Sequence, residues 1–418
     1  MTASVAIDFG SPAVRPDPHP TYRRLREESP VVWNDVTRSW VVSRYDDVAG
    51  LFTDPRMSSA RTEAIFSTLP EEVRPEMEPL RRVLGSRMLL TDPPEHTRLK
   101  SLVMKAFSAK TTETRREHIR ALCDRFLDRA AERGDLDVVA DLAQPLPSWV
   151  IADLLGVPAD DQPRFTRWSH DQVRVYDRPG TIGERVAVMR QGQASMLEMR
   201  GYLEAVIDER RREPREDLIS ELVAAEEAGD RLSTEELVVM VVALLVGGNN
   251  STAHLIANAA LTLLRRPDVV ARLREEPGLA RTTIEEVLRW ESPVQATSRV
   301  VRDEPVALGG QEMQVGDSVH LLIGSANRDP SQFPDPDDFA PARRPNRHLT
   351  FGGGPHFCLG SSTARAIAQT AVLALVERFP EARLATDEVC WQESFSFRSV
   401  VALPVVLRPA SNVAGVVR

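Results

Sequence analysis

The sequence predicts a single, mainly α-helical domain with small β-sheets. The first observation is an almost uninterrupted apolar stretch over residues 237–264, and the other two are several amphipathic helical segments and a few short strand pairs. The run Ser233-Thr234-Glu235-Glu236 before the apolar stretch is a capping box, which starts a helix. At ~1.5 Å per residue this helix is roughly 45 Å long. Because it is apolar on nearly every face, we expect it to be buried through the centre of the molecule.

The N-terminal part predicts a helix and a hairpin, followed by an irregular segment. A helical pattern over residues 21–28 ends before Pro30, and two strand patterns over residues 31–33 and 39–42 flank a turn signal. Residues 58–90 are broken into short pieces by prolines, which predicts a long irregular segment that can cover a pocket.

Helical patterns dominate the middle of the chain. Residues 91–96 read as a helix start that places His96 and Lys100 one turn apart, where residue statistics alone favour solvated surface positions. Further helices are expected over residues 109–133 and 146–155. In the following segment Trp168 and Tyr176 face either the core or a pocket.

The C-terminal part alternates between strands and a helix. We expect strands over residues 300–308 and 318–324, a helix over residues 361–379 and hairpin strands over residues 389–407. A proline-rich meander connects the second strand to the helix.

Composition excludes several classes of protein. The chain has 418 residues, of which 42% are hydrophobic and 27% charged, and we expect no apolar run close to the ~18 residues of a membrane span. The net charge of −9 disfavours a nucleic-acid partner. The three cysteines, Cys123, Cys358 and Cys390, have no framework spacing, which fits a reducing compartment. The N-terminus has no signal-peptide pattern, so the predicted location is the cytoplasm.

One loop carries a candidate metal ligand. Residues 351–360 read Phe-Gly-Gly-Gly-Pro-His-Phe-Cys-Leu-Gly, a run that cannot continue a helix and must bend tightly. The thiolate of Cys358 is a soft, electron-rich ligand, and small neighbours leave room for a bulky planar cofactor. The alternative is that Cys358 is a small buried apolar residue.

The predicted central helix is interrupted by small and polar residues. Two glycines and four small polar residues, at positions 247–252, cost about 1 kcal/mol per glycine plus the desolvation of each polar group. These residues either allow a close helix crossing with the polar groups bonded back to carbonyls, or form a π-bulge or opened groove at a functional site.

The cysteine loop resembles that of the haem-thiolate monooxygenases, the cytochrome P450 superfamily. Its pattern there is Phe-Gly-x-Gly-x-His-x-Cys-x-Gly, and the resemblance spans nearly the whole chain. It implies one domain over residues 18–408, after a flexible segment 1–17 and before a tail 409–418, with haem b between the long helix and the loop. Cys358 would be the thiolate ligand of the iron. The other implied haem-binding residues in the loop are Phe351, Gly352, His356 and Gly360.

The resemblance also implies which residues lie on the side of the haem where dioxygen binds. The family pattern (Ala/Gly)-Gly-x-(Asp/Glu)-Thr, which governs proton delivery to dioxygen, falls on Gly247 to Ser251. Here Asn250 replaces the acid and Ser251 is the alcohol, with Gly248 and Thr252 completing the predicted catalytic group. A carboxamide orients water but does not exchange protons as a carboxylate does. The proton relay that the family uses is therefore in doubt for this chain.

Three further family features match. A His-x-x-x-Arg pair that binds a haem propionate falls on His96 and Lys100, where lysine keeps the charge but loses the bidentate fork. Arg299 falls on a second propionate-binding arginine. In the family a buried Glu-x-x-Arg pair with a structural role contacts a second arginine. The matching pair here is Glu286 and Arg289, and the second arginine is Arg343. The substrate pocket is expected at Leu244, Gly247, Val294, Ala296, Phe395 and Phe397.

The implied function is a monooxygenase that hydroxylates or epoxidises an apolar small molecule in secondary metabolism, such as antibiotic biosynthesis. The resemblance implies a monomer that uses dioxygen and electrons from a ferredoxin, with NAD(P)H serving indirectly through a ferredoxin reductase. A basic docking face is expected around Lys105, Lys110, Arg115, Arg116 and Arg347. Two alternatives stay open: an atypical enzyme that uses peroxide or catalyses coupling, rearrangement or nitration, and a non-catalytic haem or ligand-binding protein.

Overall fold

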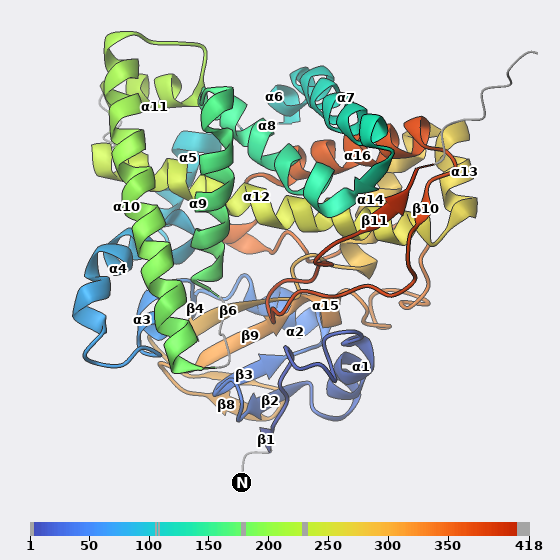
Figure 1. Cartoon of the computed structure of the whole chain (residues 1–418). Helices are drawn as coiled ribbons and strands as arrows, with labels where there is room; N and C mark the ends of the chain where they lie inside the picture. The colour runs from blue at the N-terminus through green and yellow to red at the C-terminus, as the bar shows by residue number, and fades with distance from the viewer. Residues whose placement is uncertain (1–3, 105–106, 108, 177–180, 228–232, 408–418) are drawn as a thin grey trace, which may run out of the picture.

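The computed structural model describes residues 4–104, 107, 109–176, 181–227 and 233–407. Helices dominate them (Figure 1): α1 (His19–Glu28), α2 (Tyr45–Leu51), α3 (Thr62–Phe66), α4 (Glu78–Gly85), α5 (Glu95–Met104), α6 (Ala109–Thr114), α7 (Arg116–Arg133), α8 (Pro145–Leu155), α9 (Gln162–Arg174), α10 (Ile182–Arg212), α11 (Leu218–Glu227), α12 (Thr234–Leu264), α13 (Pro267–Glu275), α14 (Ala280–Trp290), α15 (Ile323–Ala326) and α16 (Ser361–Arg378). The predicted mainly helical class is confirmed.

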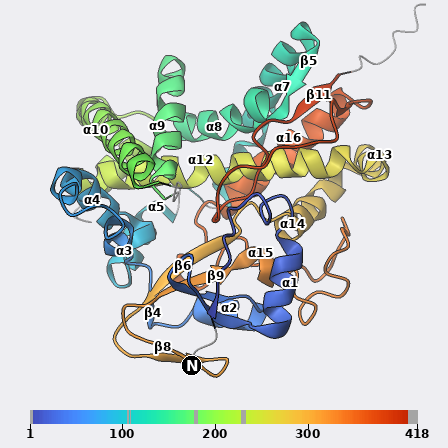
Figure 2. The ribbon, with the colours of Figure 1, turned by 60° about the horizontal axis from the view of Figure 1, so that its bottom comes forward.

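Helix α12 runs through the centre of the molecule, as the sequence predicted (Figures 1 and 2). The capping box of Ser233 and Glu236 starts it. It packs against α8, α9, α14 and α16. The stretch of small and polar residues does not break it, because α12 is α-helical from end to end and has no π-bulge.

The main sheet lies beside this helical layer and has six strands in the order β1-β2-β3-β9-β6-β4. Its strands are β1 (Ser4–Val5), β2 (Val31–Asn34), β3 (Ser39–Val42), β4 (Met57–Ser58), β6 (Ala296–Val301) and β9 (Ser318–Leu322). Strands β2 and β3 form the predicted antiparallel hairpin. The other strands are β5 (Asp135–Asp137), β7 (Val306–Leu308), β8 (Gln311–Met313), β10 (Arg383–Leu384) and β11 (Pro404–Val406).

One prediction for the chain ends needs correction and another is confirmed in part. The predicted flexible segment 1–17 is packed where it is described, because β1 pairs with β2 and the side chains of Ile7 and Phe9 are buried. The predicted hairpin over residues 389–407 is present as a short antiparallel pairing of Trp391 with Val400. The only strand described there is β11, which pairs with β10 and β5. The predicted tail 409–418 lies outside the described residues.

Two segments are long and apolar enough to cross a membrane by length and composition, contrary to the expectation of none. They are Val138–Leu155 and the whole of α12, and 67% of each apolar window is buried inside the molecule. In α12 this burial comes from packing against neighbouring helices, which is typical of a core helix.

Candidate active site

The cysteine loop is bent tightly by glycines and held at both ends. Gly352 and Gly354 have positive φ values of +71° and +61°. A Cβ at Gly354 would lie 2.5 Å from the backbone oxygen of Phe52, so only glycine fits there. The N–H of Cys358 donates to the carbonyl of Phe351 at 2.9 Å. This geometry presents Cys358 immediately before the N-terminus of α16.

Free space lies beside a glycine of the cysteine loop and beside a glycine of α12. A Cβ added at Gly360 or at Gly247 would meet no atom within 4 Å. Leu359 packs against an apolar cluster to which α12 contributes Leu245 and Val246. The loop and this stretch of α12 (the cradle) therefore leave room beside Cys358 for a flat cofactor.

Two histidines at the cysteine loop have buried nitrogens without partners among the described residues. The rings of His96 and His356 lie 4.0 Å apart, and the Nδ1 of His96 and the Nε2 of His356 are buried with no hydrogen bond. Burial and the neighbouring His96 and Arg299 lower the pKa of His356 to about 3. A buried polar atom without a partner is costly, so these atoms mark a binding site for a polar group.

Arg299, on β6, is the strongest candidate for binding an anion there. Its side chain is 5% exposed, and its only described hydrogen bond goes to the carbonyl of the adjacent Ser298, at 2.9 Å. Burial, followed by repulsion from Arg61, lowers its pKa to about 9. A buried guanidinium without a carboxylate partner fits the propionate role that the family resemblance assigned.

Lys100 lies at the loop but binds protein atoms in this structure. Its Nζ donates to the carbonyl oxygens of Pro355 and Phe357 at 2.6 and 2.9 Å. It therefore ties α5 to the cysteine loop on either side of His356. A contact with a haem propionate stays a prediction.

The predicted catalytic residues lie together on α12, with different environments. The hydroxyl of Ser251 donates back to the carbonyl of Gly247 at 3.0 Å, which is the back-bonding that the sequence left open. The carboxamide of Asn250 is half-buried and has no hydrogen bond to the described residues. Thr252 is buried, and a Cβ at Gly248 would press against Ile151 at 2.6 Å.

The predicted structural triad is confirmed. Glu286 and Arg289 are fully buried and form a bidentate pair with distances of 2.7 and 2.9 Å. Arg343 donates to the same carboxylate at 3.1 Å. Arg289 also donates to three carbonyls of the meander that leads to the cysteine loop, those of Asn327, Pro336 and Asp338. The triad therefore fixes the path of the chain into the loop.

Two positioning residues were missed by the sequence analysis. Asn327 donates to the hydroxyls of Ser292 and Thr350 and accepts from the N–H of Leu349, just before the cysteine loop. Asp92 accepts from Ser58 and Ser59 and so links the start of α5 to the main sheet. Their partners are distant in the sequence, so no local pattern reveals them.

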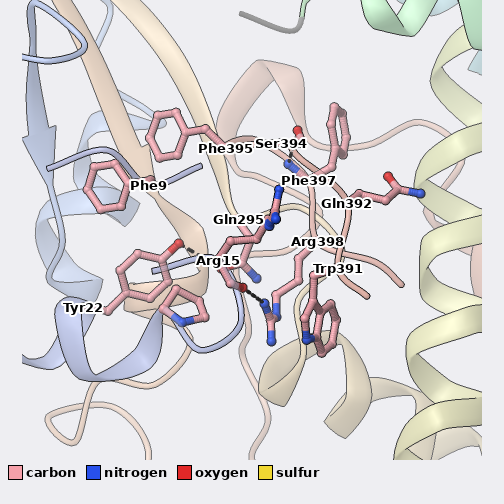
Figure 3. Close-up of a pocket in the computed structure, with 11 residues that line it drawn as sticks. Phe9, Arg15, Tyr22, Gln295, Trp391, Gln392, Ser394, Phe395, Phe397 and Arg398 are labelled. Carbon is pink, nitrogen blue, oxygen red and sulfur yellow. Dashed lines mark hydrogen bonds between the residues drawn. The ribbon is translucent and has the colours of Figure 1, made fainter. Parts of the chain in front are cut away.

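The predicted pocket residues lie in different environments. Figure 3 shows Phe395 beside Phe9, where the rings stack at 4.7 Å, so Phe395 belongs to the apolar cluster of the main sheet. Phe397 points the other way and contacts the ring of His254 on α12. Trp168 is fully buried in the core. The remaining pocket residues are Leu244 and Val294, which are partly buried, and Ala296, which is buried.

Together, the fold, the cysteine loop and the unpartnered polar groups beside it define a haem-thiolate enzyme. The cytochrome P450 family profile matches residues 65–393. The chain belongs to the cytochrome P450 family, and it is a monooxygenase with haem as its cofactor.

Several bacterial cytochromes P450 match over almost the whole chain. Cytochrome P450 107B1 of Saccharopolyspora erythraea is 40% identical, over 93% of this chain and 95% of its own. The monooxygenase PikC of Streptomyces venezuelae is 38% identical, over 93% and 91%. The epothilone C/D epoxidase of Sorangium cellulosum is 36% identical, over 97% and 96%.

A solved structure agrees with the fold. The crystal structure of P450BioI in complex with hexadec-9Z-enoic acid ligated acyl carrier protein superposes with a TM-score of 0.86. It is 35% identical to this chain, and the alignment covers 95% of this chain and all of that one.

Proposed function

We propose that this monooxygenase hydroxylates or epoxidises an apolar small molecule in bacterial secondary metabolism, in the cytoplasm, with electrons from a ferredoxin. The observation that carries the proposal is the cysteine loop, which presents Cys358 just before α16 and leaves free space beside Gly360. The relatives support the reaction type, since one of them is the epothilone C/D epoxidase.

The residues of the cradle fit haem. The Sγ of Cys358 would hold the iron, and the N–H of Gly360 donates to that sulfur and moderates its charge. Arg299, His96 and His356 would bind the propionates through their unpartnered nitrogens. Bound there, haem supplies the activation of dioxygen for transfer of one oxygen atom to the substrate.

The chain itself supplies the shape and the polar groups on the substrate side. Leu244 and Val294 exclude water by offering apolar surface. The hydroxyl of Ser251 gives its hydrogen to the Gly247 carbonyl, so its oxygen remains an acceptor for water. The side chain of Asn250 has a free carbonyl oxygen and a free N–H₂ group. It can therefore either accept a hydrogen bond from a water molecule or donate one to it.

The electron donor is proposed from the surface beside the cysteine loop. Lys110 and Arg347 are exposed there, and the ring of Phe357 is 45% exposed. Arg116 is less available because it pairs with Glu113, and Lys105 lies outside the described residues. An apolar spot with basic neighbours suits an acidic ferredoxin, whose own reductase would draw on NAD(P)H.

Two measurements test the proposal. A red-shifted Soret band of the reduced, CO-bound protein is expected if the thiolate of Cys358 binds the iron, and this band should vanish in Cys358→Ser. Turnover with a ferredoxin, its reductase and NADPH should exceed turnover with peroxide alone. Equal or greater turnover with peroxide would contradict the ferredoxin route and favour the atypical chemistry that Asn250 suggests.

A further inference from the structure

One turn near the C-terminal end, residues 394–397, lies between the N-terminal segment and α12 (Figure 3). On one side the ring of Phe395 stacks on that of Phe9, with the ring centroids 4.7 Å apart and the ring planes at 13°. On the other side the ring of Phe397 contacts that of His254 on α12, with the centroids 5.7 Å apart. The turn therefore links the N-terminal segment to the central helix.

The ring of Phe397 lies against the part of α12 that carries the predicted catalytic residues. His254, which it contacts, follows Asn250 by four residues in α12, so the two side chains lie one turn apart on the same face of the helix. The backbone of Phe397 also forms an antiparallel bridge with Val294, another predicted pocket residue. A displacement of the Phe397 ring would therefore change the space beside this stretch of α12.

Arg398, directly after the turn, ties it to the N-terminal segment. Its guanidinium is buried and donates to the carbonyl oxygens of Arg15 and Pro16 at 2.7 and 3.0 Å. The same guanidinium pairs with the buried carboxylate of Glu291. Arg15 in turn pairs with Glu393, just before the turn, at 2.6 Å. The N-terminal segment and the turn are therefore joined by polar contacts on either side of the stacked rings.

The ring of Phe9 fills most of the space behind the turn. The N–H of Gln295 donates to the carbonyl of Ser396 at 2.8 Å, which holds the backbone of the turn at one point. Only a cavity of about 20 Å³ remains between the turn and the N-terminal segment, which is room for about one water molecule. Removing the ring of Phe9 would enlarge this cavity, and the side chain of Phe395 could then move into it, because cores relax toward voids.

We propose that Phe9 is a positioning residue for the substrate pocket. By stacking on Phe395 it fixes the turn so that the ring of Phe397 stands against α12 and limits the size of the molecule that fits over the haem. This rests on the proposed function, because it takes Phe397 as a wall of the pocket. The N-terminal segment thus takes part in substrate selection through the turn.

The test compares two ligands that bind the haem iron through the same kind of nitrogen, imidazole and 4-phenylimidazole. Each is titrated into the full-length haem protein while the Soret band is followed, and the ratio of the two dissociation constants reports the room for the phenyl group. Phe397→Ala should change this ratio by at least roughly 10-fold, which is the lower end of what fit in an apolar pocket is worth. Phe9→Ala should change it in the same direction by at least roughly threefold, because it acts through the position of Phe397.

The double variant and a matched control make the result specific. Phe9→Ala combined with Phe397→Ala should give the ratio of Phe397→Ala alone, because coupled residues are not additive. Ile7→Ala is the control, since Ile7 is buried in the same apolar cluster but its backbone N–H and carbonyl bind the side chain of Asn34 on β2. It should lower the melting temperature, as core truncations do, and keep the wild-type ratio. Phe9→Leu retains most of the apolar volume without the ring, so it should fold and still shift the ratio part of the way.

Three outcomes would overturn the proposal. The first is a ratio in Phe9→Ala and Phe9→Leu that stays at the wild-type value or moves against that of Phe397→Ala. The second is a shift of the same size in Ile7→Ala, which would reduce the effect to a general loss of packing. The third is an unchanged ratio in Phe397→Ala. The reduced, CO-bound spectrum of the wild type separates all three from a failure of thiolate ligation, which would contradict the proposed function.

Discussion

At the scale of single residues, the two sides of the cradle differ in how closely their residues match the sequence pattern of the family. The cysteine side keeps the full pattern, and the glycine bends are enforced by contacts such as that of Gly354 with Phe52. On the α12 side an amide replaces the acid, and the adjacent hydroxyl is turned back to its own helix. The chemistry of proton delivery is therefore the part of the site that is most specific to this chain.

Restoring the acid tests that departure. We expect Asn250→Asp to change the fraction of electrons that end in product instead of peroxide, because a carboxylate exchanges protons whereas a carboxamide only orients water. The measurement is product formed against NADPH consumed, with hydrogen peroxide quantified. An identical ratio in Asn250→Asp and wild type would show that position 250 has no part in the proton path.

Filling the open space tests the cradle. Gly360 has φ −82°, which any residue adopts, so Gly360→Leu is expected to leave the fold intact and to place its side chain where the haem would lie. We expect haem content to fall by at least about tenfold, since even ~1.4 kcal/mol of lost binding has that effect. Far-UV circular dichroism and haem absorbance per protein provide the readouts.

Gly278→Leu is the matched control. A Cβ added at Gly278 would also meet no atom within 4 Å, but this glycine belongs to the short helical turn Pro277–Leu279 that precedes α14. We therefore expect Gly278→Leu to keep its haem. Full haem content in Gly360→Leu would place the cofactor elsewhere.

At the scale of elements, α14 is the support of the cysteine loop. Its buried carboxylate, Glu286, accepts from Arg289, Arg343, the N–H of Ala340 and Asn346. Buried ion networks lose stability mainly when one member is removed, because the remaining charges are left unpaired. The triad therefore acts by holding the meander in place and has no contact with substrate.

Removing a member of this triad should abolish haem-loaded protein. We expect Glu286→Ala and Arg289→Ala to lower the free energy of unfolding by about 3–5 kcal/mol, which is a large part of the stability of a domain. Haem content after expression and thermal unfolding are the measurements. The control is Glu276→Ala, at an exposed acid after α13. Normal haem content in either triad variant would refute this role.

At the scale of the whole molecule, ion pairs between distant elements give stability a dependence on pH. Glu285 of α14 accepts from Arg365 of α16 at 2.7 Å and contacts His348 at 3.2 Å. Burial raises its pKa, but the hydrogen bonds from His348 and Arg365 outweigh burial and bring the pKa from 4.5 to about 2. The carboxylate therefore joins two core helices most strongly when it is ionised.

The sign of the pH effect follows from that lowered pKa. The contribution of Glu285 is complete above pH 4.5 and is lost as the pH falls towards 2. We expect Glu285→Gln to lower stability by about 1–3 kcal/mol at neutral pH and to flatten the fall in melting temperature below pH 4.5. Glu117→Gln, at an exposed position, is the control. A parallel fall in Glu285→Gln and wild type would contradict the assignment.

Sequence reasoning reached the parts of the molecule that local patterns encode. The capping box of α12, the glycine-rich loop and the spacing of Glu286 and Arg289 all lie within short windows, and the structure confirms them. The role of Asn327 and the pairing of β1 were missed because their partners are far away in the chain. Whether a polar side chain is paired depends on tertiary packing, and no periodicity in the sequence reports it.

The position of β1 at the border of the main sheet affects how the protein can be handled. Strand β1 covers the backbone groups of β2, and the side chains just after it close over the apolar cluster around Tyr22. Shortening the chain past Phe9 would leave β2 as an exposed edge, ready to pair with another copy. Affinity tags are therefore better separated from Ser4 by a linker, and truncated versions are expected to aggregate.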